Sequence, residues 1–413
     1  MNKITVARDR LAAAENNCKL FVRRHSILLF CLAACLIHLV ICYSLRKETS
    51  RDFAGYVGVW ITHIRENGGI FALKGKFANY SQPYLILLAL FSYLPIKSLY
   101  LAKGISIIFD FILAFVVQLL VSEFCAARTK TKNIFRALSF IVVLLTPTIF
   151  INSAQWAQCD VIYTSFALLS LYFIHRKRPF AGFIFFGIAL AFKLQAIFLL
   201  PFFIFFYFKS KRCSILHFFI IPATMIVCSL PSIIVGLPLS NVFSIYLEQS
   251  SYYKHTTLNL FNLYTLFPDN YSSIAPIGYA LLFLFLGIIT VITLKSNNKR
   301  FRDNYITIAL CVVTICTFFL PNMHERYLFI GTPLSIVWAF VEYQKYTNKK
   351  FKLLLPLVPL AYELTSLLCY TPFIMHYRSD SNRWFGFLLY LSLVIFTTLY
   401  TTQSLLHNKR QHR

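Results

Sequence analysis

The chain has 413 residues, of which 58% are apolar and only 13% are charged, and its 40 Lys and Arg outnumber 15 Asp and Glu. A soluble protein of this length cannot bury so large an apolar fraction in one core, so the composition excludes a soluble enzyme and a disordered chain. The apolar residues suffice for about a dozen membrane-spanning helices. We therefore expect an all-α polytopic membrane protein, whose net charge of +25 needs no nucleic-acid partner.

The basic residues gather in short clusters between the apolar runs, and such clusters mark the cytoplasmic side of a membrane protein. If all of them lie on that side, an even number of crossings separates each neighbouring pair. This parity predicts a multi-pass protein of the cytoplasmic (cell) membrane with both termini in the cytoplasm. The clusters lie at 1–25, 128–136, 176–178, 209–212, 295–302, 345–352 and 409–413.

The apolar runs predict about 12 spans at about 20 residues each. A basic N-terminus over 1–25 precedes the first span, 26–46, and a long outer loop over 47–97 follows it. Within that loop the run 83–95 is bounded by proline and too short to cross, so we expect a helix at the outer membrane surface. The other expected spans are 98–124, 137–152, 160–174, 180–192, 195–208, 213–235, 273–294, 304–320, 328–343, 351–371 and 385–406.

Carboxylates are scarce, and two of them stand at the expected outer ends of helices. Asp52 closely follows the first span and is either a catalytic acid at the membrane surface or the cap of the next helix. Asp160 closes the turn QWAQCD with Gln155 and Gln158. Polar residues at this depth often face a cavity, although an interfacial cap beside Trp156 explains them equally well.

Cations also occur at expected outer positions. Lys193 lies between apolar residues in the run 180–208, where it either reaches to the interface or meets an anion. His324, Glu325 and Arg326 precede a span, and such a group suits a phosphate or simply anchors the helix end. Asp110, inside the span 98–124, is expected to be a helix-packing group. The residues predict no metal-ligand set.

The motifs RDFAGYVGVW, QWAQCD, FKLQ and MHERY, in this order, resemble the GT-C superfamily of integral-membrane glycosyltransferases. Within it the chain looks most like bacterial mannosyltransferase-like proteins related to the second mannosyltransferase of GPI-anchor synthesis. The similarity covers the core 26–345, whereas the helix pair 346–406 and the tail 407–413 carry no such motif. It implies a GT-C type fold with membrane-surface helices in the long first outer loop.

The resemblance also implies a function. A single hexose, such as mannose, glucose or galactose, would pass with inversion from a polyprenyl-phosphate-linked donor to an envelope glycan or a lipid-linked acceptor outside the membrane. Asp52 would activate the acceptor hydroxyl, as a base or an orienting carboxylate. Lys193, His324 and Arg326 would hold the donor phosphate. The residues implied to bind the sugar or the acceptor are Gln155, Gln158, Asp160, Gln195 and Glu325.

No cofactor is expected for this reaction, although a divalent cation stays open, and the sequence does not set an oligomeric state. The alternative function is a transporter or flippase of lipid-linked sugars, which would use a similar polar cavity and similar cations. Such a carrier needs sites reachable from both sides, often near the midplane of inverted repeats. The unusual polar residues here stand at the outer ends and no repeat is visible, which favours the enzyme.

Overall fold

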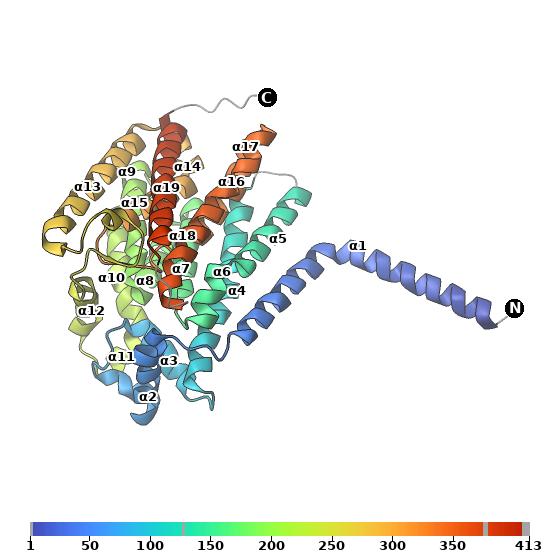
Figure 1. Ribbon diagram of the computed structural model, residues 1–413, viewed down its shortest axis with the longest axis horizontal. Helices are drawn as coiled ribbons and strands as arrows, with labels where there is room; N and C mark the ends of the chain where they lie inside the picture. The colour runs from blue at the N-terminus through green and yellow to red at the C-terminus, as the bar shows by residue number, and fades with distance from the viewer. Residues whose placement is uncertain (1–2, 126–128, 375–378, 407–413) are drawn as a thin grey trace.

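The computed structural model describes residues 3–125, 129–374 and 379–406, and this part of the chain is almost entirely helical (Figure 1). Five of its helices are long and apolar enough to cross a membrane, or six if one bent pair counts as a single span. The all-α membrane architecture is therefore confirmed, whereas the count of 12 spans stays a prediction. The five lie in α1 (Lys3–Ser44), α4 (Ser98–Phe124), α13 (Tyr271–Lys295), the consecutive α17 and α18 (Lys349–Leu354 and Leu357–Ile374), and α19 (Asp380–Leu406).

Most other predicted spans form shorter apolar helices of 10–17 residues. At about 1.5 Å per residue, such a helix is shorter than the apolar core of a bilayer, which is about 30 Å thick. They pack inside the bundle: α7 contacts α4 and α8, α10 contacts α8, and α15 contacts α19. These helices are α7 (Asp160–His175), α8 (Pro179–Phe192), α9 (Leu200–Lys209), α10 (Leu216–Cys228) and α15 (Tyr305–Phe319); α16 (Gly331–Lys345) is a further short helix.

The segment predicted as a span over 137–152 is bent, and its count as one span stays a prediction. The structure has α5 (Thr129–Leu145) and then α6 (Pro147–Phe150), with a bend of 49° between them. Proline lacks an N–H and disfavours a helical conformation in the residue before it, and Thr146 is accordingly extended at φ −72° and ψ 120°. After α6 a π-helical turn, η3 (Ile151–Gln155), carries the chain into the interior.

Two further breaks interrupt apolar runs. Lys193 is extended at φ −158° and ψ 132°, so α8 ends there and the chain continues as a 3-10 turn, η4 (Leu194–Leu199), into α9. This confirms the two short helices predicted for 180–208. The run 213–235 also divides, because Ser229, at φ −101° and ψ 0°, separates α10 from α11 (Leu230–Ile234), whose second residue is Pro231.

The first outer loop is largely helical, as predicted. It contains η1 (Phe53–Val57), α2 (Gly58–Glu66), η2 (Gly69–Lys74) and α3 (Gln82–Ser92), with α2 and α3 at the bottom of Figure 1. Helix α3 packs on α2, α4 and α8, and its Leu85 and Leu88 are buried against protein. The apolar run 83–95 therefore supplies core residues to the bundle.

A second segment, between α11 and α13, is tied to the loop before α16. It comprises α12 (Leu239–Ser251), β1 (Thr257–Leu258) and η5 (Leu263–Leu266). Strand β1 pairs in parallel with β2 (Met323–His324), so that Leu258 lies opposite His324. The backbone N–H of Glu325 then donates to the carbonyl of Leu258 at 3.1 Å. These backbone hydrogen bonds fix the backbone of His324, Glu325 and Arg326, which we call the HER sequence.

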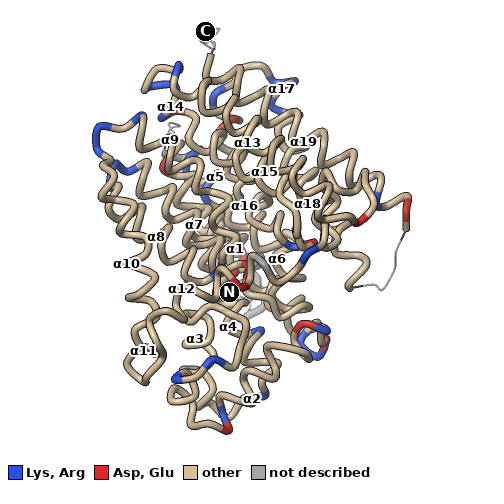
Figure 2. The backbone as a smooth tube through the Cα atoms, turned by 90° about the vertical axis from the view of Figure 1, so that its left-hand side faces the viewer, with Lys and Arg blue, Asp and Glu red and all other residues tan. Residues whose placement is uncertain are grey.

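Four of the basic clusters meet at one end of the bundle (Figure 2). Lys209 Nζ donates to the Ser296 carbonyl at 2.5 Å, and Lys345 Nζ donates to the Asp303 carbonyl at 2.9 Å, where α14 (Asn298–Asp303) closes this end. The clusters 176–178, 209–212, 295–302 and 345–352 therefore share one face, as the parity argument requires. That this face is cytoplasmic stays a prediction from the positive-inside rule.

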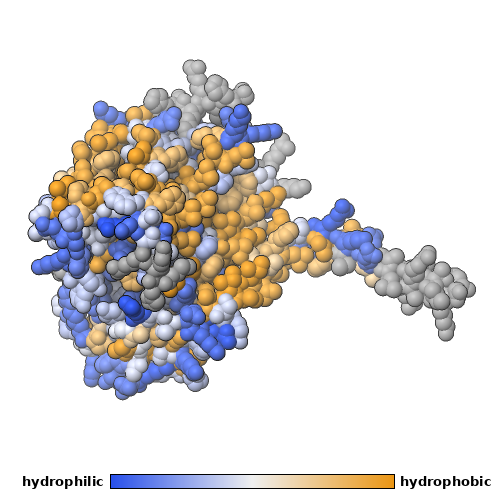
Figure 3. Space-filling view, viewed as in Figure 1, coloured by the Kyte–Doolittle hydropathy of each residue, from blue (hydrophilic) through white to orange (hydrophobic). Residues whose placement is uncertain are grey.

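An apolar belt covers much of the face shown in Figure 3, with hydrophilic residues below it. Large apolar side chains of α1, α13 and α19 are exposed there or on neighbouring faces: Val40 is 59%, Phe283 70% and Leu399 64% exposed. Water does not favour so extensive an apolar surface, so lipid is the solvent that fits it.

Two glycines of α13 provide a matched test of this packing. A Cβ on Gly278 would overlap the Tyr264 hydroxyl and meet the Phe319 carbonyl oxygen at 2.7 Å, whereas a Cβ on Gly287 would meet nothing within 4 Å. We expect Gly278→Ala to destabilise the protein by about 1–3 kcal/mol through overpacking. Gly287→Ala should be neutral or stabilising, because alanine favours helix. Thermal unfolding in detergent measures both, and equal effects would contradict this packing of α13.

Candidate functional site

Four segments far apart in the sequence meet at the end of the bundle opposite the basic face. We define the polar cluster by its members Asp52, Gln158, Asp160, Lys193, Glu325 and Arg326. Helix α7 begins at Asp160 and ends at His175 beside the basic clusters, so its length separates the two ends. The cluster thus joins the start of the first outer loop, the turn after η3, the break after α8 and the loop before α16.

Asp52 is the most accessible carboxylate of the polar cluster, with 25% of its side chain exposed. Its Oδ2 accepts from Gln158 Nε2 at 2.7 Å and from Arg326 Nη1 at 3.1 Å. Within the described residues, its Oδ1 has no hydrogen-bond partner. One oxygen is thus held by two donors while the other is open to accept a proton or a hydrogen bond.

Asp160 is fully buried and is paired with a buried lysine. Lys193 Nζ lies 2.5 Å from Asp160 Oδ1, and Lys193 itself is only 7% exposed. Asn152 Nδ2 donates to Asp160 Oδ2 at 3.0 Å, and Arg326 Nε lies 3.8 Å from the same oxygen. The buried carboxylate is therefore neutralised and held in place from three sides.

The backbone of the turn orients these side chains. Ala157 adopts a left-handed conformation at φ 60°, which reverses the chain between η3 and α7. The N–H of Gln158 donates to the Asn152 carbonyl at 2.9 Å, and Ser106 Oγ on α4 donates to the Gln158 carbonyl at 2.7 Å. The turn is thus closed on itself and anchored to a long helix, so that Gln158 and Asp160 are preorganised.

The HER sequence completes the polar cluster. Arg326 Nη1 donates to Glu325 Oε1 at 2.9 Å, and His324 Nδ1 lies 3.8 Å from Glu325 Oε2. Burial by itself would raise the pKa of Glu325, but His324 and the positive Arg326 lower it below the ordinary value. Burial would lower the pKa of Arg326, but Asp52 and Glu325 raise it well above the ordinary value. Both groups are therefore ionised at neutral pH.

Not every predicted site residue joins the polar cluster. Gln195 contacts the hydroxyl of Tyr327, the residue that follows Arg326. Gln155 forms no bond to the polar cluster within the described residues. The ring of His324 lies between those of Tyr253 and Tyr327, at centroid distances of 5.3 and 5.1 Å. Asn152 was not among the predicted site residues, although a polar residue so close to QWAQCD was a usable signal.

The charge balance bears on how a phosphate could bind. The polar cluster has three carboxylates and two permanent cations, and both cations are bonded to carboxylates. Lys193 is nearly inaccessible, whereas the buried Nε of Arg326 has no hydrogen-bond partner. An entering anion would therefore meet Arg326, and His324 at 17% exposure, before Lys193.

Within the described residues, one set brings three potential metal ligands together: His38, Cys42 and Asp110, whose ligand atoms lie within 4.8 Å of one another. His38 Nε2 is 3.2 Å from Asp110 Oδ2, and Ser153 Oγ donates to Asp110 Oδ1 at 2.6 Å. This buried set joins α1, α4 and η3, which is the packing role expected for Asp110. A divalent cation could be held there, in a different place from the polar cluster.

The lowered pKa of Glu325 makes a prediction about acid stability. A carboxyl group with a lower pKa in the folded state stabilises the protein above its unfolded pKa, about 4.3, and loses that contribution as the pH falls through the folded value. We expect Glu325→Gln to flatten the loss of thermal stability between about pH 5 and pH 3. Melting temperatures of both proteins across this range test it, and parallel curves would contradict the assignment.

The polar cluster must be interpreted from its own chemistry. No protein-family model matches the chain, and no curated protein matches it either. The GT-C resemblance of the motifs therefore supplies an expectation about the reaction, and the side-chain geometry supplies the means to test it.

Proposed function

We propose that the protein is a membrane glycosyltransferase that transfers a hexose from a polyprenyl-phosphate-linked donor to an envelope glycan or a lipid-linked acceptor on the outer side of the cytoplasmic membrane. The observation that carries this proposal is the pairing of Asp52 with Arg326 at 3.1 Å. It places an accessible carboxylate oxygen beside Arg326, whose Nε has no hydrogen-bond partner and lies 3.8 Å from Asp160 Oδ2. A transfer of this kind needs both, because one proton must be accepted and one phosphate must leave.

The proposed reaction uses the open oxygen of Asp52. Asp52 Oδ1 accepts the proton of the acceptor hydroxyl while the oxygen of that hydroxyl attacks the anomeric carbon of the sugar. The bond from this carbon to the phosphate oxygen breaks, and the leaving phosphate takes the electron pair. Attack opposite to the leaving group inverts the configuration. Arg326 stabilises the charge that grows on the phosphate, with His324 as a second donor.

The buried pair plays a positioning role in this proposal. Lys193 is bonded to Asp160 and nearly inaccessible, so it neutralises that carboxylate and does not contact the donor first. Asp160 in turn holds Arg326 through its Oδ2 at 3.8 Å. Gln158 binds Asp52, and Glu325 binds Arg326. These four residues thus orient the base and the cation, while Gln195 remains a proposed sugar contact.

A lipid-linked-sugar flippase is the second candidate. It is favoured by one observation, namely that a basic cavity lies at the other end of the bundle from the polar cluster. A carrier would need an anion site at each end of its path. The enzyme is preferred because the open carboxylate oxygen of Asp52 has no role in moving a phosphate.

The experiment that separates the two uses purified protein in vesicles. Polyprenyl-phosphate mannose, glucose and galactose, each with a labelled sugar, are offered with an envelope extract. The enzyme consumes a donor and labels the extract, whereas a flippase moves the donor between leaflets without consuming it. The proposal fails if no donor is consumed and if the glycan composition of cells lacking the gene is unchanged.

A further inference from the structure

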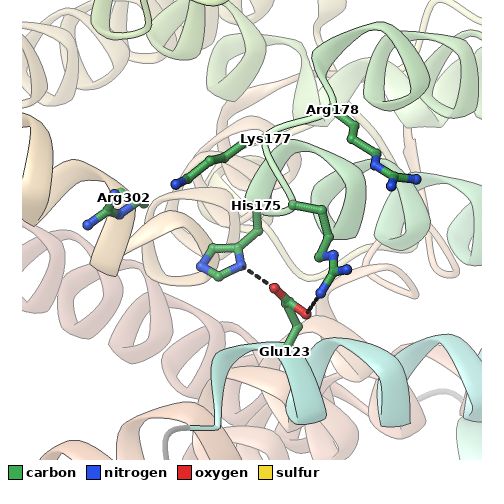
Figure 4. A pocket seen from close by; sticks show the side chains of 6 residues that line it. Glu123, His175, Lys177, Arg178 and Arg302 are labelled. Atoms are coloured by element: carbon green, nitrogen blue, oxygen red, sulfur yellow. Dashed lines mark hydrogen bonds and ion pairs between the residues drawn. The ribbon is translucent and has the colours of Figure 1, made fainter.

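A basic cavity opens at the end of the bundle opposite the polar cluster (Figure 4). Its volume is about 490 Å³, and it lies between the end of α4, the turn from α7 to α8, and α14. A second cavity of about 240 Å³ shares His175, Lys177 and Arg302 with it and extends to the turn after α9. The described residues that carry charge around both cavities are Glu123, Arg176, Lys177, Arg178, Lys209, Lys211, Arg212 and Arg302.

The lining of the two cavities contains one acidic residue and seven basic residues. Both carboxylate oxygens of Glu123 are already paired, because its Oε2 lies 3.1 Å from Arg176 Nη1 and its Oε1 lies 3.4 Å from His175 Nδ1. Lys209 is bonded to backbone carbonyls. The remaining lining cations therefore lack a neutralising group in the cavity itself.

Lys177 and Arg302 are the residues around which the two cavities join. Figure 4 shows Lys177 extending toward Arg302, while His175 turns to Glu123. Arg176 is paired with Glu123 at 3.1 Å. Within the described residues, Lys177 forms no ion pair, and Arg302 reaches only Asp303 at 3.9 Å. Two like charges that line one opening repel each other, and an anion bound there would relieve that repulsion.

Apolar side chains flank this charge. Phe180 follows the basic turn on α8 and is 63% exposed, and Phe208 precedes Lys209 on α9 and is 61% exposed. A soluble anion would gain nothing from these rings, whereas a phospholipid places its phosphate among cations and its chains against apolar helices. Basic pockets between membrane helices on the cytoplasmic side bind anionic head groups in this way.

We propose that this cavity binds the phosphate head group of an anionic phospholipid, held between Lys177 and Arg302. The site is independent of the reaction at the polar cluster, because α7 separates the two along its whole length. Bound lipid would neutralise these two cations and connect the turn after α7 to α14. The protein is then expected to be more stable in a bilayer that contains anionic lipid.

The test measures binding of phosphatidylglycerol to delipidated protein in neutral detergent. The variant K177Q/R302Q should bind it on the order of tenfold more weakly, because each basic residue contributes to the attraction of an anionic head group. The control K349Q/K350Q removes two exposed cations from α17 at the same end and should bind like the parent. Circular dichroism and size-exclusion profiles establish that both variants are folded.

Three outcomes would overturn this proposal. Equal loss of binding in both variants would show a general surface attraction, and unchanged binding in K177Q/R302Q would exclude the cavity. If inorganic phosphate competed as well as phosphatidylglycerol at the same concentration, the ligand would be a free anion.

Phosphatidylcholine should stabilise the protein less than phosphatidylglycerol, and salt should weaken the binding of the parent.

Discussion

Asp52→Asn is expected to lower sugar transfer about 10²–10⁴-fold, which is the usual contribution of a general base. An amide keeps the size of the carboxyl group but cannot take the proton of the acceptor hydroxyl. Asp52 is 25% exposed, so the change should have little effect on folding. Binding of the donor should persist, because Arg326 and His324 remain in place. Transfer of labelled sugar by purified protein measures the first effect, and retention of labelled donor measures the second.

The control for Asp52→Asn is Glu66→Gln. Glu66 is an exposed carboxylate in the same outer loop, at the end of α2, and makes no contact with the polar cluster. The two variants lose one negative charge each, so any general effect of charge on lipid substrates is shared. Full activity in Asp52→Asn would disprove its role as a base, and equal losses in both variants would point to surface charge instead.

Lys193→Met is expected to destabilise the protein by about 3–5 kcal/mol, because it leaves a buried carboxylate without its cation. Lys193 Nζ lies 2.5 Å from Asp160 Oδ1, and the two side chains are 7% and 0% exposed. Methionine has a comparable length and fills the same space with apolar atoms. Unfolding by heat or denaturant in detergent, compared with the parent, measures the loss.

The single variant Asp160→Asn and the double variant Asp160→Asn with Lys193→Met complete a thermodynamic cycle. Removing both charges leaves no unpaired ion in the interior, so most of the lost stability should return. Transfer activity should recover less, because an amide at residue 160 holds Arg326 less strongly than a carboxylate does. A double variant as unstable as Lys193→Met alone would show that the ion pair is not what Lys193 contributes.

Much of the candidate site could be predicted from where polar residues interrupt apolar runs. Asp52, Asp160, Lys193 and Arg326 each stand at the end or the break of such a run, and the structure brings all four together. Their partners could not be predicted in the same way. Asp52 and Arg326 are 274 positions apart, so their contact depends on how the whole bundle packs.

The missed features arise from backbone geometry that side-chain patterns do not show. Gln155 was predicted to join Gln158 and Asp160, but the bend at Pro147 and the left-handed Ala157 direct Asn152 to Asp160 instead. The run 83–95 was predicted to lie at the membrane surface, which stays a prediction, but the burial of Leu85 and Leu88 against protein was not foreseen. Hydropathy shows that such a segment avoids water, but lipid and protein satisfy this requirement equally.

The sequence by itself determined that the chain is a helical membrane protein with basic clusters on one face, and it separated the candidate acids Asp52, Asp160 and Glu325 from those clusters. Composition and charge pattern suffice for this, because the bilayer excludes unpaired backbone groups and favours cations on one side. Only the tertiary structure decided which charges pair. It left Asp52 with one open oxygen and enclosed Asp160 with Lys193, because the energy of an ion depends on its burial and on partners that folding alone brings near.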